Sequence, residues 1–134
     1  MIVVDTNIIA YFYIKGDNSA LVEKLAQLEP HWVAPVLWRS EFRNVLALYI
    51  RQSKLNVSQA IWLMENAVNQ MAGNEFDVPT YKILTLVAQS SCSAYDCEFV
   101  ALAQILSTVL VTMDKRILRS FPDWTLHPRD FIGH

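Results

Sequence analysis

Met1-Ile2-Val3-Val4-Asp5-Thr6-Asn7 opens the chain and decides how the rest is expected to fold. The three consecutive apolar residues at 2–4 predict a short strand buried on both faces. Asp5 follows directly, at the carboxyl end of a strand, where open α/β sheets place their ligands. An aspartate here is equally suited to cap a helix that begins near Ile8. This stretch alone therefore leaves both roles open.

Length and composition limit the classes of protein that the chain can belong to. It has 134 residues, of which 53% are hydrophobic, so we expect a single domain over 1–134 with a substantial core and exclude disorder. A net charge of −2 argues against a simple basic nucleic-acid binder. The only cysteines, Cys92 and Cys97, are too few for a disulfide scaffold or a zinc site. Since no basic leader and no membrane-length apolar run are found, we expect a cytoplasmic protein that does not bind a membrane.

Strand-like and helix-like segments alternate along the chain. Apolar periodicity, prolines and capping residues predict strands over 2–4, 31–34, 108–112 and 124–127. The same signals predict helices over 8–14, 19–28, 35–53, 58–72, 79–89, 93–107 and 115–120. Pro35 and Ser58 are the expected starts of two of these helices. The alternation predicts an α/β fold, with a mostly parallel central sheet flanked by helices in three layers.

A second acid repeats the placement of the first. Asp114 follows the apolar run 109–111 as Asp5 follows 2–4. Parallel strands that each end in an acid would direct both carboxylates into one crevice. The alternative is that Asp114 only caps the helix that begins at Lys115.

Glu41 is the acid that is hardest to explain by structure alone. On the predicted helix it shares an apolar stripe with four residues, Leu37, Trp38, Val45 and Leu48. Carboxylates are rarely buried unless they are paired or bind a cation. Arg39 and Arg43 are poor partners, because residues two apart on a helix do not face each other. The position therefore favours a functional role.

Asp96 is expected in the first turn of the helix that begins after Ser93. A capping box, in which Asp96 reaches back to Ser93, is a structural alternative that does not exclude a functional role. Four converging carboxylates would raise one another's pKa values unless a cation compensates for their charge. Sites made only of carboxylates suit Mg²⁺ or Mn²⁺ rather than zinc. The three histidines fall in no metal-ligand spacing.

Four stretches in order resemble a known family. These are Val-Val-Asp-Thr-Asn (3–7), Ser-Glu-Phe (40–42), Ser-Ala-Tyr-Asp-Cys-Glu-Phe-Val-Ala-Leu-Ala (93–103) and Leu-Val-Thr-Met-Asp-Lys-Arg-Ile-Leu (110–118). From Ile2 to about Phe131 the chain resembles PIN domains, and more narrowly the VapC-type ribonuclease toxins of toxin–antitoxin pairs. The resemblance implies a PIN-like, Rossmann-like α/β/α fold and a Mg²⁺- or Mn²⁺-dependent single-strand endoribonuclease.

The resemblance also implies roles for individual residues. The family's acidic positions correspond to Asp5, Glu41, Asp96 and Asp114 here, as catalytic and metal-binding residues. Asp5 and Asp96 would be the main ligands. The supporting polar positions correspond to Thr6 or Asn7 and to Thr112. A metal-activated water would cleave the RNA phosphodiester bond, so no protein nucleophile is required.

The balance of charge is compatible with RNA. If a metal neutralises four of the 13 acids, nine remain against 11 lysines and arginines. The candidates for phosphate contacts are Lys115, Arg116, Arg39 and Arg43. Each is also explained as an ordinary solvated residue on a helix.

Two other classes of function stay open. A haloacid-dehalogenase-type phosphatase also begins with a strand and an aspartate, but it normally carries a second aspartate where this chain has Asn7. A non-catalytic RNA-binding or partner-binding module is the other alternative, with the acids serving as caps and ion pairs.

Aromatic and apolar residues also predict protein partners. The domain is small for the number of such residues on its predicted helices: Phe12, Tyr13, Trp38, Tyr49, Ile61, Trp62 and Met64. We therefore expect a homodimer. As the resemblance implies, we also expect a groove for an amphipathic segment of an antitoxin. The alternative is a monomer whose aromatic residues fill its own core.

Overall fold

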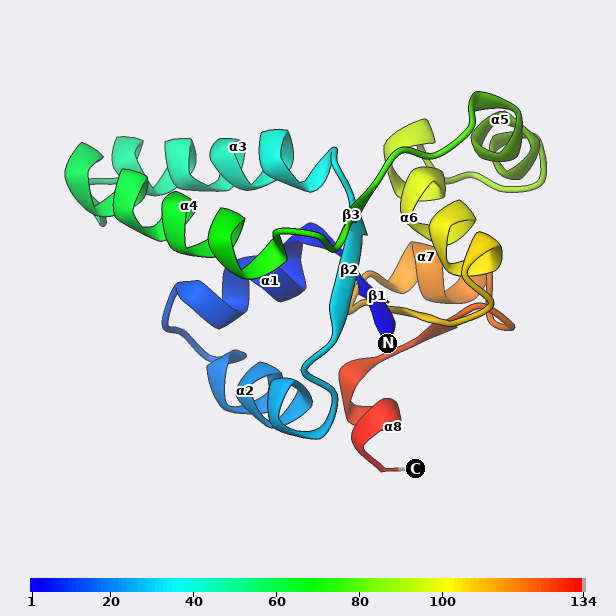
Figure 1. The fold of residues 1–134 in the computed structure, drawn as a ribbon, viewed down its shortest axis with the longest axis horizontal. Helices are drawn as coiled ribbons and strands as arrows, with labels where there is room; N and C mark the ends of the chain where they lie inside the picture. Colours follow the sequence, from blue (N-terminus) through cyan, green and yellow to red (C-terminus); the bar gives the residue numbers. More distant parts are fainter. Residues whose placement is uncertain (134) are drawn as a thin grey trace.

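A computed structural model describes residues 1–133 and places a parallel sheet between two groups of helices (Figure 1). The strands are β1 (Ile2–Val4), β2 (Trp32–Pro35), β3 (Glu75–Phe76), β4 (Leu110–Val111) and β5 (Thr125–Leu126). Their order across the sheet is β3-β2-β1-β4-β5, and every neighbouring pair is parallel. The chain runs outward from β1 in one direction and then in the other. The carboxyl ends of β1 and β4 therefore flank the switch point where such sheets bind ligands.

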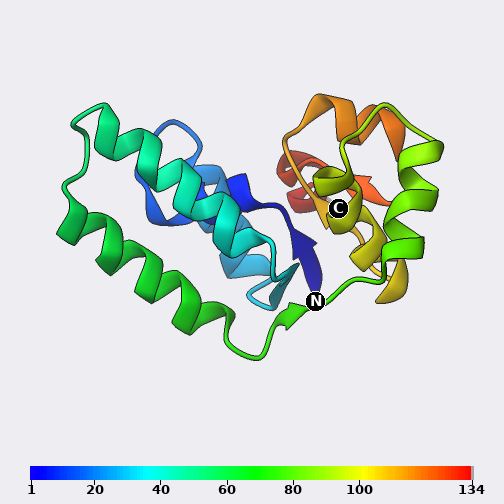
Figure 2. The same cartoon turned by 90° about the horizontal axis from the view of Figure 1, so that it is seen from above.

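Helices cover both faces of this sheet, as the alternation of segments predicts. Four helices lie on one side: α1 (Thr6–Tyr13), α2 (Ser19–Leu28), α3 (Trp38–Arg51) and α4 (Val57–Met71). On the other side lie α5 (Thr80–Ala88), α6 (Ala94–Ile105) and α7 (Lys115–Ser120), while α8 (Pro128–Ile132) packs on α2. Figure 2 shows that the α3–α4 hairpin extends well beyond the sheet. The predicted three-layer α/β fold is confirmed.

The core explains why these segments adopt these positions. All three residues of β1 are buried, as expected for a strand covered on both faces. Helix α6 packs against β1, β2 and β4 on one side and against α5 on another. It is accordingly buried almost all round from Cys97 to Ala103. None of the helices in residues 1–133 is both long and apolar enough to cross a bilayer.

The prediction that Pro35 opens a helix is wrong. Pro35 ends strand β2 and pairs with Phe76 of β3, and the helix begins only at Trp38. A proline suits the end of a strand as well as the start of a helix. Because Pro35 pairs with β3, it belongs to the strand and not to the helix. Since β3 has only two residues, the sequence carried no strand signal for it.

Two other boundaries differ for local reasons. Helix α4 is capped by Asn56 and not by Ser58, because Asn56 and Gln59 form a reciprocal capping box. Helix α8, which the sequence did not predict, starts at Pro128 in its first turn.

The aromatic residues expected at an interface divide into two sets. Trp38 is fully buried in the core, so the expectation that it lies on a surface is wrong. Phe12 and Tyr13 pack against each other and against the core. Ile61 and Trp62 of α4 are more than half exposed, so these two lie on the surface, where a partner could contact them.

Candidate active site

The register of the sheet places Asp5 beside Thr112. Val4 pairs with Val111, so the next residue on each strand meets its counterpart at the carboxyl edge of the sheet. The Thr112 hydroxyl donates a hydrogen bond to Asp5 Oδ2, and the Ile8 backbone N–H donates to Oδ1 at 3.1 Å. Asp5 therefore caps α1 and also lines the cavity described below. The capping role is confirmed, and the position of Asp5 at the cavity leaves the role in ligand binding open.

Glu41 lies on the first turns of α3 and faces α1. The Thr6 hydroxyl donates to Glu41 Oε1 at 2.7 Å. Neither nearby arginine neutralises this carboxylate, because Arg39 binds Glu75 through two nitrogen atoms and Arg43 donates to Ser40. Within residues 1–133, Glu41 forms no ion pair. The structural explanation by an ion pair is thus excluded for the described part of the chain.

Asp96 and Asp114 each lie at the start of a helix. The Ser93 hydroxyl accepts a hydrogen bond from the Asp96 backbone N–H at 3.1 Å, whereas no described contact returns from the Asp96 carboxylate to the cap. Asp114 caps α7 by accepting from the Ile117 N–H at 3.0 Å. Its own N–H donates to Thr112 Oγ1 at 3.0 Å. Thr112 thus contacts two of the four acids.

All four acids line one cavity of about 440 Å³ at the switch point. Asp5 comes from the end of β1, Glu41 from α3, Asp96 from the first turn of α6 and Asp114 from the start of α7. The remaining lining residues are Thr6, Asn7, Leu37, Ser40, Asn44, Val45, Tyr95, Phe99 and Ile117. The described lining includes no lysine, arginine or histidine, so no basic side chain balances the four carboxylates there.

Burial, with a smaller contribution from the neighbouring carboxylates, raises the pKa of two of the acids. Burial raises the pKa of Asp5 to about 6, against the hydrogen bonds from Thr112 and Ile8, and the charges of Asp114 and Glu41 add to the rise. Burial also raises the pKa of Glu41, and the charge of Asp96 contributes. The acids therefore interact electrostatically across the cavity.

A hard divalent cation suits these donors, with one restriction. The donors are carboxylates and hydroxyls, and their surplus charge is negative. No three acidic, histidine or cysteine side chains in residues 1–133 are grouped closely enough to hold one ion together. Mg²⁺ usually binds through one or two carboxylates and keeps several waters. The residues present therefore fit an ion whose contacts to the cavity are mostly through water.

Comparison with known proteins identifies the family. The family model described as "PIN domain" matches residues 2–121. The chain belongs to the PIN-domain family. No curated protein matches the sequence.

Solved structures share the PIN fold at low sequence identity. PAE2754 from Pyrobaculum aerophilum superposes with a TM-score of 0.76 at 16% identity, over 98% of this chain and 92% of that one. FitAcB from Neisseria gonorrhoeae superposes with a TM-score of 0.75 at 20% identity, over 96% of this chain and 99% of that one. A toxin–antitoxin complex from Klebsiella pneumoniae superposes with a TM-score of 0.69 at 13% identity, over 96% of this chain and 98% of that one.

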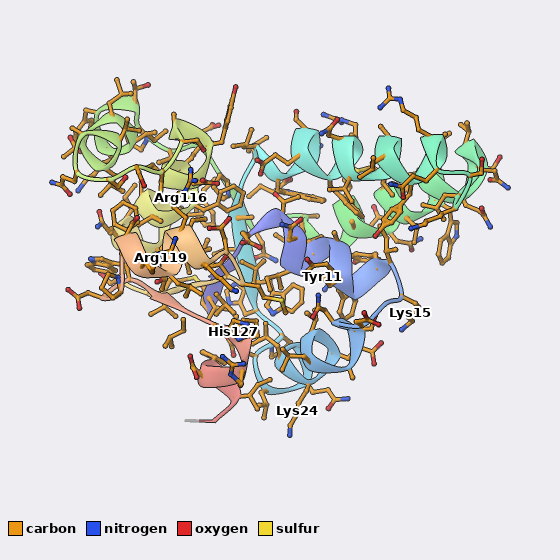
Figure 3. All side chains as sticks on the ribbon, turned by 180° about the vertical axis from the view of Figure 1, so that it is seen from behind. Tyr11, Lys15, Lys24, Arg116, Arg119 and His127 are labelled. Atoms are coloured by element: carbon orange, nitrogen blue, oxygen red, sulfur yellow. The ribbon has the colours of Figure 1, made fainter. Side chains whose placement is uncertain are left out.

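The basic residues predicted to contact RNA differ in their contacts within this PIN domain. Lys115 and Arg116 are exposed at the start of α7, directly after Asp114. Arg43 is exposed on α3, whereas the Arg39 guanidinium is held by Glu75. Arg119 is also exposed, one helical turn beyond Arg116 on α7 (Figure 3). Residues three apart share a helix face, so Arg119 adds a positive charge to the face that carries Arg116.

The sequence also missed neutral residues at the cavity. Ser40, Asn44 and Tyr95 line it, although none was assigned a role. Ser40 and Asn44 are three and seven positions beyond Leu37 on α3, so helical spacing from the cavity wall could have found them. Metal-dependent hydrolysis gives no signal for Tyr95, because it requires no protein nucleophile.

Proposed function

We propose that this PIN domain is a Mg²⁺- or Mn²⁺-dependent endoribonuclease that cuts single-stranded RNA, and that it is the toxin of a toxin–antitoxin pair. The observation that carries the proposal is the cavity at the switch point, in which four acids face one another without a basic partner. Helix capping accounts for Asp5 and Asp114 but not for Glu41 and Asp96, because α3 and α6 are capped by other residues. Family membership supports a nuclease.

A divalent ion bound here would activate a water for attack on phosphorus and stabilise the charge that develops on the phosphate. Asp5 and Asp96 are proposed as its principal ligands, with Glu41 and Asp114 acting mostly through bound waters. The two threonines hold two of these acids in place, since Thr112 binds Asp5 and Thr6 binds Glu41.

Glu41 has a further part in this scheme. Its Oε1 is engaged by Thr6, and no described residue donates to its Oε2. Oε2 is therefore the atom proposed to accept a hydrogen bond from the attacking water. A carboxylate whose pKa is raised is a better proton acceptor, which suits it to this role.

The test is cleavage of a labelled RNA by the purified chain, with analysis of the new ends. Attack by water leaves a linear phosphate, whereas attack by the RNA 2′-hydroxyl leaves a 2′,3′-cyclic phosphate. We expect linear ends, cleavage in Mg²⁺ or Mn²⁺, no cleavage in a chelator, and resistance of the duplex. Cyclic ends or cleavage in the chelator would contradict the proposal. Release of phosphate from monoesters without cutting of RNA would instead favour a phosphatase.

We propose an antitoxin as the protein partner, bound in a second groove. This groove, of about 790 Å³, lies between the end of α1 and the α3–α4 hairpin, and its apolar lining includes Tyr13, Tyr49, Leu55, Trp62 and Leu63. Trp62 is 65% exposed. An amphipathic helix binds such a groove through its apolar face. The similar Klebsiella structure is a toxin–antitoxin complex, which supports a partner of this kind.

A homodimer is proposed on the remaining exposed apolar residues. Leu48 of α3, Ile61 of α4 and Leu84 of α5 are each more than half exposed. Light scattering at micromolar concentration tests the proposal, and a monomer would contradict it.

A further inference from the structure

Tyr95 lies at the edge of the acidic cavity and is 63% exposed. It occupies the first turn of α6, next to Asp96 in the sequence. Phe99, one turn further along α6, also lines the cavity but is buried. Because residues four apart share a helix face, both rings lie on the face of α6 that lines the cavity, Phe99 buried and Tyr95 exposed.

Most of the exposed residues that line the cavity are uncharged. These are Asn7, Ser40, Asn44 and Tyr95, and Asp114 is the one exposed acid of the lining. The carboxylates suit a cation with a phosphate, whereas exposed uncharged residues with an aromatic ring suit the uncharged part of a nucleotide. Single-strand-binding proteins bind bases by stacking them on such rings.

Within the described residues, the Tyr95 side chain has no structural role that explains its position. No described contact engages its hydroxyl, and the core is complete without it. Tyr81 of α5 is similarly exposed, at 68%, but it lies outside the cavity and beside Lys82. Tyr95 differs from Tyr81 in its position at the cavity and not in its exposure.

We propose that Tyr95 is the platform on which an unpaired base next to the cleaved phosphate stacks. This inference rests on the proposed ribonuclease activity and makes Tyr95 a positioning residue for the substrate. A base within a duplex is stacked on its neighbours and cannot use this platform. The platform therefore accounts for a preference for single strands.

The test uses three variants and two substrates. Tyr95→Leu removes the aromatic face, Tyr95→Phe keeps it, and Tyr81→Leu is the matched control for loss of an exposed tyrosine. The substrates are a short single-stranded RNA with a mapped cleavage site and the same RNA with abasic nucleotides on both sides of that site. Stacking of one base is worth about 1–3 kcal/mol, which corresponds to a factor of about 5 to 150 in binding.

For the intact RNA we expect Tyr95→Leu to raise KM by at least about fivefold with kcat nearly unchanged, while Tyr95→Phe and Tyr81→Leu behave as the wild type. For the abasic RNA we expect the wild type and Tyr95→Leu to be equal. An unchanged KM for Tyr95→Leu, or an equal loss on both substrates, would overturn the inference.

A binding measurement separates failure of this inference from failure of the proposed activity. Fluorescence anisotropy of a labelled hexauridylate in Ca²⁺ reports binding whether or not the protein cuts RNA. Weaker binding by Tyr95→Leu, restored in Tyr95→Phe, would support the platform even if no cleavage occurs. Equal binding by all variants would overturn it even if the wild type is an active ribonuclease.

Discussion

The Thr112 hydroxyl donates a hydrogen bond to the Asp5 carboxylate across the switch point between β4 and β1. The same oxygen accepts from the Asp114 N–H. One fully buried threonine therefore fixes the positions of two acids that are more than a hundred residues apart in the sequence.

Replacing Thr112 by valine keeps the shape of the side chain and removes both hydrogen bonds. We expect a loss of about 1–3 kcal/mol in the free energy of unfolding, because the Asp114 N–H and Asp5 Oδ2 lose their partner. RNA cleavage should fall as well, since Asp5 is less well held. Thr112→Ser should recover most of both losses. Chemical denaturation and cleavage rates test this, with Thr85→Val on the exposed face of α5 as the control. A stable, fully active Thr112→Val would contradict the assigned role.

Asp5→Asn should change how stability depends on pH. The folded protein holds a proton on Asp5 up to about pH 6, whereas the unfolded chain releases it near pH 4. The metal-free protein should therefore lose stability as pH rises between these values, by at most about 3 kcal/mol. The introduced asparagine retains a side-chain oxygen to cap α1 and carries no charge, so the variant should lack this decline. Denaturation curves between pH 4 and 7 without metal provide the measurement, and parallel declines in both proteins would contradict the assignment.

Glu41→Gln separates a functional acid from a structural one. Glutamine can still accept the hydrogen bond from Thr6, and the variant loses a charge whose pKa is raised by burial and by Asp96. We expect an unchanged or higher melting temperature together with a large loss of RNA cleavage. The opposite result, retained cleavage with a loss of about 3–5 kcal/mol in stability, is the one expected for a broken buried ion pair.

Trp62→Ala tests the second groove. Since Trp62 is mostly exposed, its removal should change the stability of the isolated chain little. Co-purification with the product of a neighbouring small reading frame should be weakened strongly. Tyr81→Ala, which removes an equally exposed ring outside the groove, should leave the complex intact. Equal recovery of the partner with both variants would place the interface elsewhere.

The fold was largely predictable because its signals are local. The β-branched run 2–4, the cap at Ser93 and the spacing of α2 each predict their element without reference to the rest of the chain. Pro35 and β3 were not predictable in this way. A two-residue strand has no periodicity, and the role of Pro35 depends on its pairing with Phe76.

For the candidate site, residue type was predictable and arrangement was not. The four acids were predictable as candidates, because three lie at the ends of predicted elements and Glu41 lies on an apolar stripe of a predicted helix. The sequence already indicated that Asp5 and Asp114 could cap helices, whereas the binding of both by Thr112 follows only from the register of β1 and β4. The exposed uncharged residues Asn44 and Tyr95 at the cavity have no sequence signature, because exposed polar and aromatic residues occur on any helix.

The most direct test of the account is the rate at which Asp96→Asn cuts single-stranded RNA in Mg²⁺ or Mn²⁺, compared with the wild type and with Asp123→Asn. Asp123 is an exposed acid outside the cavity, so its replacement controls for the loss of one negative charge. We expect the wild type and Asp123→Asn to cut at similar rates, and Asp96→Asn to show no metal-dependent cleavage while remaining folded. Undiminished cleavage by Asp96→Asn would contradict the claim that the four acids form the catalytic site.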